Sequence, residues 1–191
     1  MPTLFSHPAP VLCFGLALNR GVISWRLLVA ALVLSVLPDM DVIGFKFGVS
    51  YANILGHRGL SHSLAFAVGM GAVAFLAAPW LHARRLTAFV VCTGAVTTHI
   101  ALDALTNGGL GVAVLWPFSE ARHFFPWQPI EVSPFAPRHF LTARGARVLL
   151  SEWQWVWLPS LAMLCAIRFC ACVCGRHPQN KAPRQPIYTQ K

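Results

Sequence analysis

Long apolar runs, separated by short polar segments, most constrain what this chain can fold into. Four of them approach the roughly 20 residues that an α-helix needs to cross a bilayer. These runs cover residues 22–37, 64–81, 86–106 and 154–174, and a shorter apolar run covers residues 11–18. They predict an all-α fold, a polytopic membrane helical bundle with about four to five membrane-embedded helices.

Composition supports a membrane rather than water as the solvent. Charged residues make up 11% of the chain, whereas a soluble domain is about 25% charged. We expect one membrane-embedded domain over residues 1–174, followed by a basic, disordered tail over residues 175–191. The net charge is +9, but the positive residues lie between the apolar runs, where membrane topology explains them. The expected partner is therefore the lipid bilayer, and we expect no nucleic-acid partner.

Carboxylates and imidazoles gather in two stretches of a chain that has only six acidic residues. Asp39 and Asp41 follow the run over residues 22–37, and His57 and His62 precede the next run. The run over residues 86–106 contains the pair His99 and Asp103. Oxygen and nitrogen donors held together are what a divalent cation such as zinc requires. The pattern predicts a divalent metal cofactor, most simply zinc, as one or two ions.

Topology places these donors at one membrane face. If the chain crosses at each apolar run, His7 and the donors of residues 39–62 fall on one side, with Asp103 near them. His99 then lies one helical turn deeper on the same helix face. Short segments on the opposite side are richer in arginine and lysine, so the positive-inside rule puts the site face outside the cytoplasm.

Each donor has a structural alternative. Asp103 could be an acid hydrogen-bonded to a neighbouring helix, and His99 could be an interior histidine. Asp39 and Asp41 could cap a turn, but two carboxylates so close repel unless a cation or proton lies between them. We therefore predict Asp39, His62, His99 and Asp103 as metal ligands, with His7 as a fifth candidate. Asp41 is a second ligand or the base that orients the attacking water. His57 is the other candidate for the catalytic step.

Other polar residues could contact a substrate. Arg58 and Arg122 are candidates for holding an anionic group such as a phosphate, with ordinary surface charge as the alternative. Glu120 and Glu131 could complete a second metal or act as a base, and their spacing does not choose between these roles. Residues 110–153 are rich in Pro and Trp, which is typical of an interfacial cap. The alternative is a lid or acyl-chain groove over the metal.

At these residues the sequence resembles the YdjM-like family of bacterial inner-membrane-associated metal-dependent hydrolases. The matching motifs lie within residues 6–130. They are Ser6-His7, Leu37-Pro38-Asp39-Met40-Asp41, His57-Arg58-Gly59-Leu60-Ser61-His62-Ser63, His99-Ile-Ala-Leu-Asp103 with its following Thr106-Asn-Gly-Gly, and Leu115-Trp116-Pro117-Phe118. The family is distantly similar to zinc-dependent phospholipase C and the single-strand-specific zinc nucleases.

The resemblance implies an all-helical protein of the bacterial inner membrane with a multinuclear zinc site. Its implied ligands are His7, Asp39, His62, His99 and Asp103, with Asp103 as the candidate bridge. Ser61 stands where the family more often has threonine, which keeps the hydroxyl. An H-x-x-x-E pair does not follow Asp103, so the sequence does not support a third metal.

These observations predict a membrane-bound, metal-dependent hydrolase that acts on a phosphoester, with a phospholipid as a candidate substrate. The alternatives are a non-enzymatic ion or proton transporter and a metal-stabilised scaffold. A transporter requires ionisable residues through the depth of the bilayer, whereas here the donors gather at one end. The sequence leaves the oligomeric state open.

Overall fold

The computed structural model describes residues 2–18, 21–133 and 141–175, and the described residues form helices and loops without a named β-strand. In chain order, the helices are α1 (Pro8–Ala17), α2 (Trp25–Leu34), η1 (Leu37–Phe47), η2 (Leu60–His62), α3 (Leu64–Leu76), α4 (Arg85–Ala104), α5 (Ala143–Glu152), η4 (Trp153–Trp157) and α6 (Leu158–Gly175). The elements η1 and η2 are 3-10 helices, and η4 is a π turn between α5 and α6.

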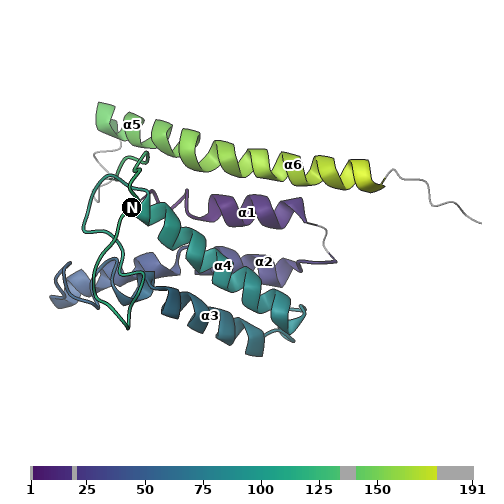
Figure 1. Ribbon diagram of the computed structural model, residues 1–191, viewed down its shortest axis with the longest axis horizontal. Helices are drawn as coiled ribbons and strands as arrows, with labels where there is room; N and C mark the ends of the chain where they lie inside the picture. Colours follow the sequence, from purple (N-terminus) through teal and green to yellow (C-terminus); the bar gives the residue numbers. More distant parts are fainter. Residues whose placement is uncertain (1, 19–20, 134–140, 176–191) are drawn as a thin grey trace, which may run out of the picture.

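The helices lie side by side as a bundle, with the long loops gathered at one end (Figure 1). The chain enters α1 at that end, and α2 and α4 return to it. Three stretches are long and apolar enough to cross a membrane: Trp25–Phe47, Arg85–Ala104 and Ala143–Cys174. Two shorter apolar helices, α1 and α3, complete the set. The prediction of an all-α polytopic bundle is confirmed.

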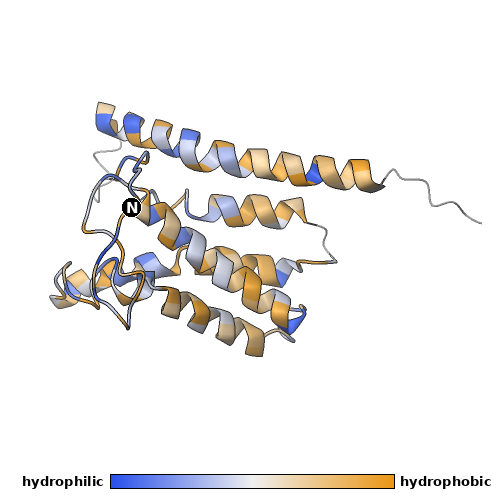
Figure 2. Ribbon diagram, in the orientation of Figure 1, coloured by the Kyte–Doolittle hydropathy of each residue, from blue (hydrophilic) through white to orange (hydrophobic). Residues whose placement is uncertain are grey.

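Small residues allow α3 and α4 to pack closely. Ala67 and Ala74 of α3 and Ala88 and Cys92 of α4 are buried in one core cluster. A Cβ added at Gly71 would overlap the Thr93 hydroxyl oxygen, so only glycine permits this approach of the two helices. Figure 2 shows apolar residues along the helices and more hydrophilic residues at the end that contains the long loops.

The helix predicted over residues 64–81 is shorter than expected. Helix α3 ends at Leu76, and residues 77–82 form turns. Pro79 cannot donate a backbone hydrogen bond, and His82 has a φ of 49°, so this stretch turns toward α4 instead of extending the helix. At 13 residues, α3 is about 20 Å long, which is less than the hydrocarbon thickness of about 30 Å.

Two segments outside the predicted apolar runs contain helices. Residues 37–47 form the 3-10 helix η1 despite Gly44, and Gly48 ends it with a left-handed φ of 77°. In the segment over residues 110–153, residues 110–133 are irregular, but α5 is a helix continuous with α6. Residues 134–140 and the predicted tail beyond Gly175 lie outside the described residues.

Candidate metal centre

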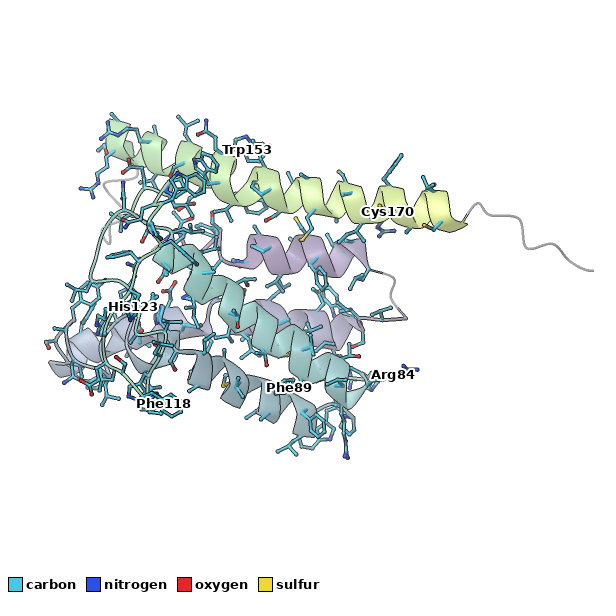
Figure 3. All side chains as sticks on the ribbon, in the orientation of Figure 1. Arg84, Phe89, Phe118, His123, Trp153 and Cys170 are labelled. Atoms are coloured by element: carbon cyan, nitrogen blue, oxygen red, sulfur yellow. The ribbon has the colours of Figure 1, made fainter. Side chains whose placement is uncertain are left out.

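Four separate pieces of the chain bring the predicted ligands together at one end of the bundle. His7 is the N-cap of α1, Asp39 lies in η1, and His62 ends η2. His99 and Asp103 lie one turn apart on α4, with both side chains on its buried face. All five side chains are at most 4% exposed. Arg84, before the first residue of α4, lies at the opposite end of the molecule (Figure 3). The structure thus produces the cluster that the topology predicts.

The donor atoms of this cluster face one another at short range. Asp39 Oδ1 lies 3.5 Å from His99 Nε2 and 3.8 Å from His62 Nε2. His7 Nε2 lies 3.5 Å from Asp39 Oδ2 and 3.7 Å from Asp103 Oδ1. Asp103 Oδ2 and His99 Nε2 each lie 3.1 Å from His62 Nε2. Asp39, His62, His99 and Asp103 each offer one ligand atom, all within 4.8 Å of one another.

These separations fit a divalent cation. Zinc binds nitrogen and oxygen at about 2.0–2.2 Å, so tetrahedral ligand atoms lie about 3.4 Å apart. Within the described residues, five buried atoms of the cluster have no hydrogen-bond partner: His7 Nδ1 and Nε2, Asp39 Oδ1 and Oδ2, and Asp103 Oδ1. Buried polar atoms are nearly always satisfied, and each exception needs a reason. A bound cation would supply that reason for Asp39 and Asp103 and for one nitrogen of His7.

Outer contacts fix which nitrogen of His99 and of His62 faces the cluster. His99 Nδ1 lies 2.8 Å from the Ser35 carbonyl oxygen, which can only accept, so Nδ1 carries the proton and Nε2 turns toward Asp39. His62 Nδ1 lies 3.2 Å from Asp41 Oδ2. A carboxylate or carbonyl behind a histidine is the usual support of a metal-binding imidazole. No sequence pattern points to Ser35, because its contact is made by a backbone carbonyl.

The surroundings shift the pKa values of His7 and His62 in opposite directions. Burial, with a smaller effect of His99, lowers the pKa of His7 to about 3. His7 is therefore neutral at physiological pH, the form that binds a metal. Burial also acts to lower the pKa of His62, but Asp103, Asp39 and Asp41 outweigh it and raise that pKa to about 10. Without a cation, a proton on His62 partly balances the charge of the carboxylates.

The two candidate catalytic residues lie beside the cluster. Asp41 Oδ1 is 2.7 Å from His57 Nδ1, and Asp41 Oδ2 accepts a 2.6 Å hydrogen bond from the Ser61 hydroxyl. With His62, they form a second group that could hold a metal ion. A carboxylate bound to an imidazole suits a general base, and it also suits an orienting role. Their catalytic role stays a prediction.

Arg58 lies in an unexpected place for a residue predicted to bind substrate. It is fully buried, and its guanidinium donates from Nε to Asp103 Oδ2 at 3.1 Å. The other two nitrogens donate to the Gly108 carbonyl and the Thr106 hydroxyl, both at 2.8 Å. Its backbone φ is 65°. In this structure Arg58 holds the ligand candidate Asp103, and its binding of a substrate anion stays a prediction.

Arg122 contacts backbone carbonyls and lies over the ring of Tyr51. It donates to the carbonyls of His57 at 2.8 Å, Asn53 at 3.0 Å and Tyr51 at 3.1 Å. It thereby fastens the loop over residues 110–133 to the turns before η2. Its predicted substrate contact is likewise untested. Glu120 and Glu131 belong to neither donor group found among the described residues.

One acidic residue that sequence reasoning missed is buried near His7. Glu152 is 2% exposed and accepts hydrogen bonds from Thr3 and Ser6. The sequence signal for it is its position beside the last apolar run, because an acidic residue at a membrane helix needs a hydrogen-bond or charge partner.

Comparison with known proteins agrees with this architecture. The model of the family described as "YdjM inner membrane protein" matches residues 1–177. The chain is 45% identical to Inner membrane protein YbcI of Escherichia coli (strain K12) over 165 residues, which are 86% of this chain and 95% of that protein. No solved structure matches the chain. The chain therefore belongs to the YdjM family of inner membrane proteins.

Proposed function

We propose that this protein is a membrane-bound metal-dependent hydrolase that cleaves a phosphoester, with zinc as the metal, bound as one or two ions. The observation that carries the proposal is the buried group Asp39, His62, His99 and Asp103, whose ligand atoms lie within 4.8 Å of one another. Asp39, Asp103 and the adjacent His7 also have buried atoms without a hydrogen-bond partner among the described residues. His7, Asp39, His62, His99 and Asp103 would hold the metal.

The residues around the cluster have distinct parts in this reaction. Bound zinc lowers the pKa of a water to about 7 and stabilises negative charge on a phosphoryl oxygen. Asp41 holds His57 at 2.7 Å, so the pair can accept the proton of the attacking water and stabilise the resulting imidazolium. Arg58 fixes Asp103, and Ser35 fixes His99, so two ligands keep their orientation while charge develops on the substrate.

A membrane lipid is the substrate that the surroundings favour. An apolar cavity of about 300 Å³ lies between α1, α2, α4 and α6. Pro10 and Thr98 line it, within one helical turn of the stacked rings of His7 and His99, whose centroids are 3.8 Å apart. An acyl chain in this cavity would bring a lipid headgroup to the depth of the cluster.

A transporter remains the second candidate, but no observation favours it. Within the described residues, the donor groups lie at one end of the bundle, whereas a translocation path requires polar groups across the membrane. We further propose that the site faces away from the cytoplasm.

Metal content tests the proposal first. Elemental mass spectrometry of the detergent-purified protein should give at least one equivalent of zinc, and a His99→Ala, Asp103→Ala double variant should lose it. Thr97→Ala, on the same helix but outside the cluster, is the matched control and should keep the metal. The zinc-loaded protein should then hydrolyse a phosphodiester or phospholipid.

Two outcomes would overturn parts of the proposal. A protein that binds no transition metal after zinc reconstitution is not a metal-dependent hydrolase. A protein that binds zinc but hydrolyses neither phosphodiesters nor phospholipids is a metal-stabilised scaffold or a transporter, which uptake assays in vesicles would separate.

A further inference from the structure

Glu152 is a buried acid at the end of α5 that the proposed chemistry does not use. It is 2% exposed and lies within the apolar stretch Ala143–Cys174. A carboxylate in such surroundings is costly unless it is fully hydrogen-bonded. Its presence there calls for a specific partner.

The partners come from the first residues of the chain. Glu152 Oε1 accepts the backbone N–H of Thr3 at 2.5 Å, and Oε2 accepts the hydroxyls of Thr3 at 2.5 Å and Ser6 at 2.6 Å. Hydrogen bonds to an ionised carboxylate are about twice as strong as neutral ones. The Glu152 side chain thus accepts three hydrogen bonds from two residues of the segment before α1.

The π turn after Glu152 adds a fourth contact. Trp157 Nε1 donates to the Ser6 hydroxyl oxygen at 3.2 Å. Residues five apart point about 140° away from each other on a regular α-helix. The wider turn over Trp153–Trp157 reduces that angle, so Glu152 and Trp157 both reach Ser6. Such single π turns are often found at functional sites.

The segment held in this way carries a candidate ligand. His7 directly follows Ser6, and neither of its ring nitrogens has a hydrogen-bond partner among the described residues. The ligand candidates His62 and His99 each have an outer contact that orients the ring. His7 instead stacks on His99, and its place is set by the backbone on which it sits.

We propose that Glu152 is a positioning residue for His7: it fastens the amino-terminal segment so that the His7 imidazole reaches the metal. This inference rests on the metal site proposed above. Helix α5 would then help to position a metal ligand, although among the described residues α5 and α6 supply no member of the donor groups.

Cobalt(II) provides the test, because its visible absorption reports the number and type of ligands. Removing a direct outer contact of a ligand lowers metal affinity about 10- to 100-fold, and Glu152 acts on His7 through Thr3 and Ser6. Glu152→Ala should therefore weaken cobalt binding about tenfold, the low end of that range, and change the spectrum as His7→Ala does. Glu152→Gln keeps the shape and one acceptor oxygen, so it should lie between Glu152→Ala and the unmodified protein. Ser160→Ala is the control, because Ser160 is a buried polar residue of α6 whose hydroxyl donates to the Val156 carbonyl, and it should change nothing.

The double variant separates positioning from general destabilisation. If Glu152 acts through His7, then His7→Ala combined with Glu152→Ala should bind cobalt no more weakly than His7→Ala alone. If Glu152→Ala does not fold, Ser6→Ala removes one of the same hydrogen bonds with a smaller change. It can then replace Glu152→Ala in both the single and the double variant.

The outcomes are distinct. Full additivity of the two substitutions, or unchanged cobalt binding in Glu152→Ala, overturns the positioning role and leaves the metal site intact. An unmodified protein that binds no cobalt overturns the metal site and this inference with it.

Discussion

At the scale of single residues, the organisation around Asp103 decides whether the cluster can hold a cation. One of its oxygens, Oδ2, lies 3.1 Å from both Arg58 Nε and His62 Nε2. The other, Oδ1, has no hydrogen-bond partner in the described part of the chain and lies 3.7 Å from His7 Nε2. Arg58 therefore orients the carboxylate while leaving one oxygen for the metal. The planar guanidinium suits this task because it donates in fixed directions.

Arg58→Lys keeps the charge but loses the three directed hydrogen bonds. We expect zinc affinity to fall about 10- to 100-fold, as for other outer contacts of a ligand, measured by competition with a chelator. Arg122→Lys, which disturbs contacts to backbone carbonyls and to the Tyr51 ring but none to the ligand candidates, should leave zinc affinity unchanged. Unchanged zinc affinity in Arg58→Lys with a raised KM for a phosphoester would instead assign Arg58 to substrate binding.

The raised pKa of His62 predicts how metal affinity depends on pH. A group with a pKa of about 10 holds its proton at pH 7, and the metal must displace it. Apparent zinc affinity should therefore increase about tenfold per pH unit between about pH 7 and 8.5. An ordinary histidine, with a pKa near about 6.5, would give a nearly constant affinity in this range. Chelator competition at several pH values measures the slope.

His7→Gln is the control for this pH dependence. The pKa of His7 is about 3, so His7 carries no proton that the metal must displace. The variant should bind zinc more weakly but keep the same slope. A flat profile in the unmodified protein would show that a metal does not compete with a proton on His62.

At the scale of helices, α4 connects the cluster with the apolar cavity. One face of α4 contributes His99 and Asp103 to the candidate metal centre, while Val90, Val91, Gly94 and Ala95 line the cavity. The two sites are therefore placed by one rigid element. A Cβ added at Gly94 would meet no atom within 4 Å, so a side chain can start there without a clash at its first atom.

Gly94→Leu should block an acyl chain without disturbing the metal. We expect hydrolysis of a phospholipid to fall at least about tenfold, since losing the chain contacts of a few CH₂ groups costs more than about 1.4 kcal/mol. Hydrolysis of a short, water-soluble phosphodiester should stay unchanged. Gly69→Leu on α3, where an added Cβ also meets no atom within 4 Å, is the control. Equal loss with both substrates would contradict a lipid-binding role of the cavity.

At the scale of the whole molecule, the bundle has two unlike ends. The metal centre and the long loops lie at one end, and α6 leaves that end and finishes at the other (Figure 1). Arg26 lies in the first turn of α2 and donates to the Trp80 carbonyl in the turn after α3, and Arg84 and Arg85 lie at the start of α4. These charges therefore flank short connections at the end of the bundle opposite the site. The positive-inside rule gives most weight to such connections.

Fusion reporters test the orientation. With the site facing away from the cytoplasm, the carboxy-terminal end is cytoplasmic. A green fluorescent protein fused after Lys191 should be fluorescent, and alkaline phosphatase fused there should be inactive, because it matures only outside the cytoplasm. The reverse pattern would place the metal centre at the cytoplasmic face.

The sequence by itself determined the helical class and the membrane setting, because apolar runs of sufficient length leave the backbone one way to satisfy its hydrogen bonds in lipid. It also placed His99 and Asp103 on one helix face, because their spacing of four residues follows the helical period. The gathering of His7, Asp39 and His62 with them followed from counting the crossings of the chain. These features depend on local patterns, and the structure shows them.

Only the tertiary structure decided what surrounds the donors. The contact of Arg58 with Asp103 and the hydrogen bonds of Glu152 with Thr3 and Ser6 join residues far apart in the sequence. No periodicity encodes such a contact, because it depends on how the helices pack and on the π turn that aims Glu152 and Trp157 at Ser6. An isolated acid or arginine in a sequence has many possible partners, and packing selects one.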